Sequence, residues 1–198
     1  MTGEEKAWRI LSELIPEDVI KRANVIYSME NKSYILKSFG IDFSISPFKK
    51  EIKSLSEKGE VFIKKLNYFF IISALTYLIN AKDIPLSKIL IKPENIKGGH
   101  FFFKGTHTLP LNKVAEKYQS DREGFIRKGI EFDAKILDYG DVSIEFMALP
   151  RIPVTLILWL SDEEFPARTE LLFDSSSESQ LPIDILWSIA MMSTLVML

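Results

Sequence analysis

The spacing of apolar residues predicts helices near the N-terminus. Between Glu4 and Ile15 the apolar side chains recur at intervals of three and four, which is helical spacing. Pro16, followed by two acidic residues, favours the start of a second helix, because acids complement a helix N-terminus. We expect this second helix to end at about Ala23.

Two longer apolar stretches predict central helices. Residues from Val61 to Ala81 carry lysines only in the first turns, and the rest is apolar on almost every side, which is typical of a helix packed on several sides. Residues 185–198 predict a final helix, with Pro182 in its first turn. Their uncharged runs of 16 and 14 residues fall short of the roughly 20 that a membrane span needs. We therefore expect both to be buried helices of a soluble core.

Alternating and β-branched residues predict strands in two regions. In SYILKSFGIDFSISPF, two short runs flank Phe39-Gly40, which predicts a hairpin or a bend. In the last third, four strand-like runs follow one another with short links, namely DAKILDY, VSIEFMAL, IPVTLILWL and ARTELLF. This order implies an antiparallel meander. The third run is apolar on both faces, so we expect it to be a central strand.

The region between these elements contains many prolines and glycines. Residues 84–110 are therefore expected to be irregular. Residues from Leu111 to about Arg127 predict a helix that is interrupted near Ser120-Asp121 and closed by Gly129. Together the pattern predicts one α+β domain over residues 1–198. Its antiparallel sheet of about four to six strands, a meander in the C-terminal third, would carry helices packed mainly on one face.

Composition excludes several classes of function. The chain has 25 basic and 27 acidic residues, so its net charge of −2 provides no general attraction to nucleic acid or anionic lipid. Cysteine is absent, which excludes disulfides, thiol catalysis and any iron–sulfur cluster or thiolate-bound zinc held by this chain. The N-terminus carries acids early and is not typical of a secretory signal. We expect a cytoplasmic protein.

Acidic residues flank the last strand of the predicted meander. The four are Asp162, Glu163, Glu164 and Asp174. Two carboxylates held close without water can divide the roles of acid and base, and carboxylate oxygens bind hard divalent ions. The alternative is a turn in solvent whose acids keep a sheet edge soluble. In that case Arg151 or Arg168 would pair with one of the acids.

The two histidines and two of the tryptophans are weaker candidates. His100 and His107 lie seven residues apart, which on one strand places them on opposite faces. A metal site there would need carboxylates from elsewhere, so we favour ordinary structural or surface roles. Trp159 and Trp187 are expected to pack on one another in the core. The chain also lacks the fingerprints GxGxxG, GxSxG and HExxH, and its Lys-Gly-Thr order does not match a phosphate loop.

The C-terminal segment LPRIPVTLILWLSDEEFPARTELLFDSS resembles the signature of a family of uncharacterised proteins from anaerobic bacteria and archaea. The pattern is P-x-[IV]-P, an apolar strand that ends in Trp, then D-E-E-F-P-A, then L-F-D. Upstream, TYLINAKDIPLS and Gly98-Gly99 also resemble family features. The resemblance covers roughly residues 60–198 and, more weakly, the N-terminal third.

This resemblance implies a function only in outline. The family bears a domain-of-unknown-function label, and some relatives are joined to an iron–sulfur segment similar to that of corrinoid methyl-transfer proteins. It implies a partner role in anaerobic one-carbon or redox metabolism, although this cysteine-free chain cannot hold such a cluster itself. The resemblance favours a specific structural or binding corner over catalysis. The residues of this corner are Asp162, Glu163, Glu164, Asp174, Arg151 and Trp159.

Three hypotheses follow. The first is a small soluble binding or accessory module beside an iron–sulfur or corrinoid partner, with an exposed apolar or aromatic patch. The second is a metal-dependent enzyme that uses the four acids, with at least three metal-binding groups converging in a cleft. The third is a peripheral membrane protein anchored by an exposed apolar face of residues 185–198. The cofactor and the oligomeric state do not follow from the residues.

Overall fold

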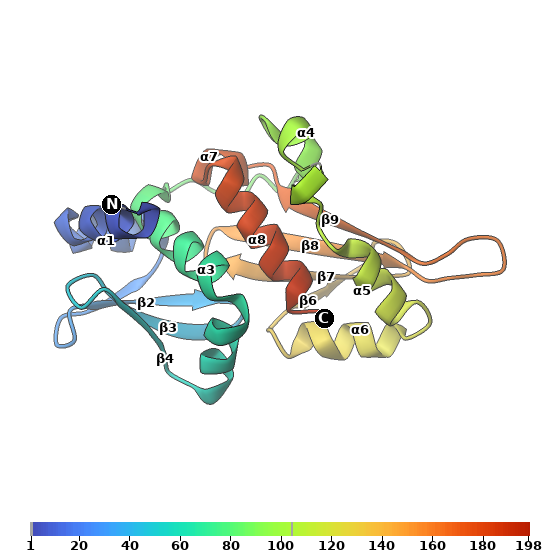
Figure 1. Ribbon diagram of the computed structural model, residues 1–198, viewed down its shortest axis with the longest axis horizontal. Helices are drawn as coiled ribbons and strands as arrows, with labels where there is room; N and C mark the ends of the chain where they lie inside the picture. The colour runs from blue at the N-terminus through green and yellow to red at the C-terminus, as the bar shows by residue number, and fades with distance from the viewer. Residues whose placement is uncertain (1, 104) are drawn as a thin grey trace.

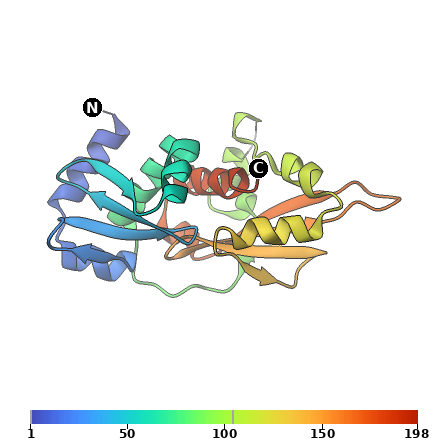
Figure 2. The same cartoon turned by 90° about the horizontal axis from the view of Figure 1, so that it is seen from below.

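The computed structural model describes residues 2–103 and 105–198, which form helices and two antiparallel sheets (Figure 1). This confirms the predicted α+β class. The strands near the N-terminus form a sheet of their own and do not join the C-terminal meander. Figure 2 shows the helices of the C-terminal half gathered on one side of their sheet.

The first two helices lie where the apolar spacing places them. Helix α1 (Gly3–Glu13) begins with a capping box, in which Thr2 and Glu5 each accept a hydrogen bond from the other's backbone N–H. Helix α2 (Pro16–Ala23) begins at the predicted proline and ends at Asn24, which adopts the left-handed conformation (φ 51°). Both ends of α2 therefore follow from local sequence signals.

The N-terminal sheet has the strand order β1-β2-β3-β4. The predicted hairpin is formed by β2 (Ser33–Ser38) and β3 (Ile41–Ser46), and two shorter strands that were not predicted, β1 (Ile26–Ser28) and β4 (Glu51–Ser54), flank it. Phe39 (φ 49°) and Gly40 (φ 72°) make the turn between β2 and β3. Tight two-residue hairpin turns favour positive φ at both positions. Glycine adopts this conformation freely, whereas a phenylalanine does so at a cost that other interactions must offset.

Helix α3 (Glu57–Asn80) is capped by Ser56 and begins four residues before the predicted Val61. It bends at Asn67, whose backbone (φ 37°, ψ −114°) is not helical. By length and composition alone this helix could cross a membrane. In the fold it is the central helix, because it packs against α1 and α8 and buries Phe62, Phe70 and other apolar side chains.

The region between the two halves contains only short elements, as its prolines and glycines predict. They are β5 (Leu90–Ile91), η1 (Pro93–Asn95), α4 (Gly99–Phe102) and η2 (Gly105–His107). Two helices follow, α5 (Leu111–Tyr118) and α6 (Arg122–Ile130), and the break between them lies at the predicted Ser120-Asp121. Asp121 caps α6 by accepting a hydrogen bond from the Gly124 N–H (2.8 Å).

One detail of this region differs from the prediction. Gly129 does not close the helix but lies within α6, which ends at Ile130. A Cβ atom at this position would lie 2.8 Å from Cδ1 of Ile144. The glycine therefore allows the helix to approach the sheet closely, and it does not terminate the helix.

The C-terminal sheet has the order β5-β9-β8-β7-β6. Strands β6 (Lys135–Leu137), β7 (Val142–Leu149), β8 (Ile152–Trp159) and β9 (Arg168–Asp174) form the predicted meander, and β5 pairs with the outer edge of β9. Strand β8 is central and is buried from Ile152 to Leu158, as its apolar faces predict. The short α7 (Ser177–Gln180) and the final helix α8 (Ile183–Leu195) complete the fold.

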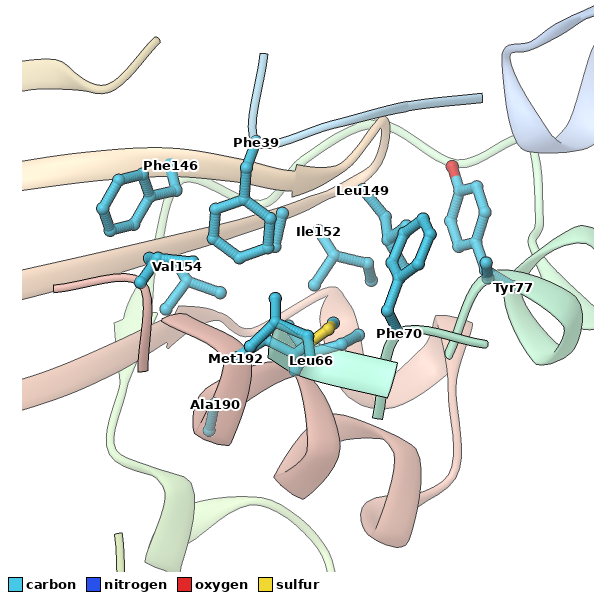
Figure 3. Packing of buried hydrophobic residues seen from close by; sticks show 14 of the residues in the cluster. Phe39, Leu66, Phe70, Tyr77, Phe146, Leu149, Ile152, Val154, Ala190 and Met192 are labelled. Atoms are coloured by element: carbon cyan, nitrogen blue, oxygen red, sulfur yellow. The ribbon is translucent and has the colours of Figure 1, made fainter. Parts of the chain in front are cut away.

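The two sheets share one hydrophobic core (Figure 3). The fully buried Phe39 extends from the β2–β3 turn toward the second sheet, and its ring centroid lies 5.3 Å from that of Phe146 and 5.5 Å from that of Phe62. At the same place the Phe39 N–H donates to the carbonyl of Met147 (3.0 Å), and the Ser38 hydroxyl donates to the carbonyl of Ala148 (2.6 Å). The β2–β3 turn therefore joins the two sheets.

Replacing Phe39 with alanine tests this junction. The substitution removes a ring that contacts aromatic side chains of three other segments, so we expect it to lower the free energy of unfolding by about 3 to 5 kcal/mol. Phe48 is 66% exposed on the same half of the protein and provides the matched control. Phe48→Ala should change stability by less than about 0.5 kcal/mol in the same urea titration. Equal effects of the two substitutions would contradict this role of Phe39.

Candidate functional site

The D-E-E-F-P-A segment forms the turn of the hairpin between β8 and β9. Asp162 shapes this turn, because its Oδ1 accepts hydrogen bonds from the backbone N–H groups of Glu164 (2.8 Å) and Phe165 (2.7 Å). The Asp162 N–H in turn donates to the carbonyl of Phe165 (3.0 Å). An aspartate that binds the N–H groups two and three residues ahead is a common way to fix a turn. Asp162 therefore has a structural role.

The two glutamates of this turn have a different environment. Glu163 and Glu164 are exposed to solvent. Within the described part of the chain, neither carboxylate accepts a hydrogen bond or forms an ion pair. These two acids are consequently available at the surface, where they give the turn a negative charge.

Asp174 lies at the far end of β9 and is buried, with 3% of its surface exposed. Its carboxylate accepts five hydrogen bonds of 2.6 to 3.0 Å, from the backbone N–H and hydroxyl of both Ser87 and Ser176 and from the backbone N–H of Lys88. Burial by itself would raise the pKa of Asp174, but the hydrogen bonds from Ser176 and Ser87 lower it below its ordinary value. Asp174 thus holds the segment before β5 against β9.

Arg151 does not pair with the acidic turn. Its guanidinium forms an ion pair with Asp83 (2.6 Å) and donates to the carbonyls of Lys21, Arg22 and Ile84. The carbonyls of Lys21 and Arg22 belong to the last turn of α2, where a helix leaves its C=O groups without partners. Arg151 therefore connects the end of α2 with the segment that follows α3.

The four acids do not converge. Asp162 lies in the hairpin turn and Asp174 at the opposite end of β9, so about 20 Å of extended strand separates them at ~3.3 Å per residue. Among the residues that the structure describes, no group of three or more histidine, aspartate and glutamate side chains could hold a metal ion. The convergence that a metal-dependent enzyme would require at these acids is absent from this part of the chain.

The histidines also lie apart from the acidic turn. His100 is on α4 and His107 is in η2. The Trp187 indole N–H donates to the His107 carbonyl (2.6 Å), and the two rings meet edge to face with centroids 5.1 Å apart. His107 thus helps to hold η2 against α8.

Trp159 and Trp187 do not pack on one another, contrary to the prediction. Successive strand residues point to opposite faces of a sheet. Leu158 belongs to the buried core, so the neighbouring Trp159 points to the other face, away from α8. The partner of Trp159 is Arg168, which lies directly opposite it in the β8–β9 pairing.

A groove of about 630 Å³ lies beside this pair. The guanidinium carbon of Arg168 lies 4.0 Å from the centroid of the Trp159 ring, a cation–π contact. Phe165 lines the groove, yet 66% of its surface is exposed to solvent. The lining residues are Asp141, Trp159, Leu160, Asp162, Phe165, Pro166, Ala167 and Arg168. We call residues 159–168 the hairpin tip.

The acids of this tip are predicted from the sequence, whereas the importance of Phe165 and Asp141 is not. A usable signal was present for Phe165, because an isolated phenylalanine beside a proline in an acidic turn has no strand partner that would bury it. No local feature of the sequence around Asp141 indicates its role in the tip. Its carboxylate accepts the Leu160 N–H (2.8 Å) across 19 residues of sequence, which only the folded chain brings together.

A family model described as "Domain of unknown function (DUF3786)" matches residues 16–195. The chain belongs to this family. The match includes the hairpin tip, Arg151 and Asp174, so the DUF3786 fold contains every residue of the candidate corner. No curated protein and no solved structure matches the chain. The resemblance seen in the C-terminal signature is thereby confirmed at the level of a family of unknown function.

Replacing Asp174 with asparagine tests its structural role. An asparagine presents an amide N–H₂ to a site that supplies only donors, so we expect the substitution to lower the free energy of unfolding by about 2 to 4 kcal/mol at neutral pH. Asp138→Asn, at an exposed aspartate before β7, should have almost no effect. Chemical denaturation followed by circular dichroism measures both changes.

The pH dependence gives a second measure of the same contact. The folded pKa of Asp174 lies below its ordinary value of 3.8, so its stabilisation is present at neutral pH and is lost as the pH falls through the folded pKa. The stability difference between wild type and Asp174→Asn should therefore shrink as the pH is lowered below about 4. A difference that stays constant down to pH 3 would contradict this account.

Proposed function

We propose that the chain is a binding module that docks onto a partner protein through its hairpin tip. The observation that supports this most directly is the exposure of Phe165 at the end of a hairpin that extends beyond the helices (Figure 1). Fully burying a phenylalanine side chain stabilises a complex by roughly 1.5 to 3 kcal/mol. An aromatic side chain of this kind, placed at the centre of a contact, is a typical anchor of an interface.

The hairpin tip is held in one conformation before any partner arrives. Asp162 fixes the turn itself, and the Leu160 N–H is bound by Asp141. The backbone N–H (2.9 Å) and hydroxyl (3.0 Å) of Ser161 both donate to the carbonyl of Gln119, in the segment between α5 and α6. Binding therefore costs little conformational entropy at the tip, which supports a role in recognition.

The charge of the hairpin tip indicates the chemistry of the partner surface. Three carboxylates, on Asp162, Glu163 and Glu164, stand against one guanidinium, on Arg168, so the tip carries a net charge of −2. We expect a partner with a basic surface around an apolar recess that accepts Phe165. Complementary charge of this kind speeds association and selects among partners.

The class of partner follows from the resemblance in the C-terminal signature. We propose an iron–sulfur or corrinoid protein of anaerobic metabolism, in the cytoplasm. A cysteine-free binding module would leave the redox or methyl-transfer chemistry to that partner. In this proposal the chain contributes recognition, and the partner contributes the cofactor.

The two alternatives find less support. An enzyme that uses the four acids needs them close together, and Asp162 and Asp174 lie at opposite ends of β9. A membrane anchor needs an exposed apolar face on residues 185–198. Seven of its apolar residues are instead buried, namely Ile185, Leu186, Ile189, Ala190, Met192, Val196 and Met197. The half-buried Trp187, Met191, Leu195 and Leu198 also pack against the core.

Substitution of Phe165 tests the proposal. Tagged wild-type chain, incubated without oxygen in native extract of its source, should retain a partner whose iron or cobalt is measured by elemental analysis and absorption spectroscopy. Phe165→Ala should weaken this association about tenfold or more, as expected for the loss of an interface anchor. Its melting temperature should stay unchanged, because the ring is exposed.

Phe48→Ala is the matched control, since Phe48 is also 66% exposed but lies outside the hairpin tip. It should leave the association intact. Retention of the partner by Phe165→Ala, or a captured protein without iron or cobalt, would contradict the proposal. Stoichiometric divalent metal on the purified chain itself, lost on Glu163→Gln, would favour the enzyme instead.

A further inference from the structure

A second cavity, of about 300 Å³, lies between the first half of α3, the end of α6 and Val196. Three lysines line it together with one glutamate and four apolar or aromatic residues. These residues are Lys58, Val61, Phe62, Lys65, Lys128, Glu131, Phe132 and Val196. We call this the lysine cavity. None of its residues belongs to the hairpin tip, so it raises a separate question of function.

Phe132 positions two of the lysines. The ammonium nitrogen of Lys58 lies 4.5 Å from the centroid of the Phe132 ring, and that of Lys128 lies 5.2 Å from it. The two lysines come from different helices, α3 and α6. A cation is attracted to the face of an aromatic ring within about 6 Å. The ring therefore gathers two positive charges at the cavity, although they repel one another.

The cavity has more positive than negative charge. Burial, and then the positive charges of Lys128 and Lys117, lower the pKa of Lys65. The carboxylate within the cavity, on Glu131, forms an ion pair with Lys128 (2.7 Å). Three lysines against one glutamate give the lining a charge of +2 in a chain whose net charge is −2.

We propose that the lysine cavity binds the phosphate group of a small anionic molecule. Phosphate carries between one and two negative charges and several acceptor oxygens, and lysine binds it as a point charge. Lys58 and Lys65 on α3 and Lys128 on α6 all line the cavity, so a phosphate bound there is exposed to the ammonium groups of two helices. Val61 and Phe62 provide an apolar wall for the rest of the molecule.

The size of the cavity favours a small molecule over a nucleic acid. A volume of about 300 Å³ lies at the lower end of the range for ligand pockets. A nucleic acid would need an extended basic stripe with several successive phosphate contacts. Here three lysines line one small cavity, which suits a single phosphate or pyrophosphate group.

Calorimetric titration with inorganic pyrophosphate at low ionic strength tests the proposal. Wild-type protein should bind it at one site per chain. Lys65→Ala and Lys58→Ala should each weaken binding by about tenfold, as expected for loss of a charge-assisted hydrogen bond. Both lysines are exposed, so these variants should keep the wild-type melting temperature. Lys64→Ala is the matched control, because it removes an equal charge from the same helix outside the cavity.

Phe132→Leu tests the positioning role of the ring. It keeps an apolar side chain of similar size but removes the aromatic face, so it should weaken pyrophosphate binding while every lysine remains. Three results would overturn the proposal. The first is that wild-type protein does not bind pyrophosphate. The second is that Lys64→Ala weakens pyrophosphate binding as much as Lys65→Ala does. The third is that a single-stranded oligonucleotide binds more tightly than pyrophosphate and at the same lysines.

Discussion

The structure depends on the contact that the β2–β3 turn makes with the second sheet. Phe39 occupies a left-handed conformation that is costly for a phenylalanine, and its complete burial against Phe62 and Phe146 offsets that cost. The hydrogen bond from the Phe39 N–H to the Met147 carbonyl fixes how the β2–β3 turn approaches the second sheet. Because this contact joins the two sheets, α3 and α8 can pack over both of them as a single core. The hairpin tip and the lysine cavity lie at the edges of this common scaffold.

Several charged residues serve the fold by satisfying backbone groups that the irregular segments leave without partners. Asp174 accepts hydrogen bonds from two such segments, and Arg151 donates to three carbonyls. Arg22 performs the same task for the end of α3, where it donates to the carbonyls of Leu78 and Ala81. A buried polar group without a partner costs about 1 to 3 kcal/mol, so such residues stabilise the fold. Their charge is therefore a poor guide to chemistry in this protein.

Two further surfaces, the hairpin tip and the lysine cavity, have opposite character. The hairpin tip combines an exposed aromatic ring with excess negative charge, and the lysine cavity combines a recess with excess positive charge. Recognition of a large partner uses a projecting anchor, whereas capture of a small anion uses a concave and basic pocket. The two sites can be disabled independently, because they share no residue.

The amino-acid sequence alone predicts the class of fold, several helix boundaries and the C-terminal meander, because these depend on local signals such as Pro16, the Ser120-Asp121 break and the apolar β8. It also predicts the acidic turn that forms the hairpin tip. Long-range packing sets the separate first sheet, the different surroundings of Trp159 and Trp187, and the roles of Asp174, Phe165 and the three cavity lysines. The physical reason is distance along the chain. Ser87 and Asp174 are 87 residues apart, and Lys58 and Phe132 meet from different elements, so their contacts follow from packing and leave no local pattern.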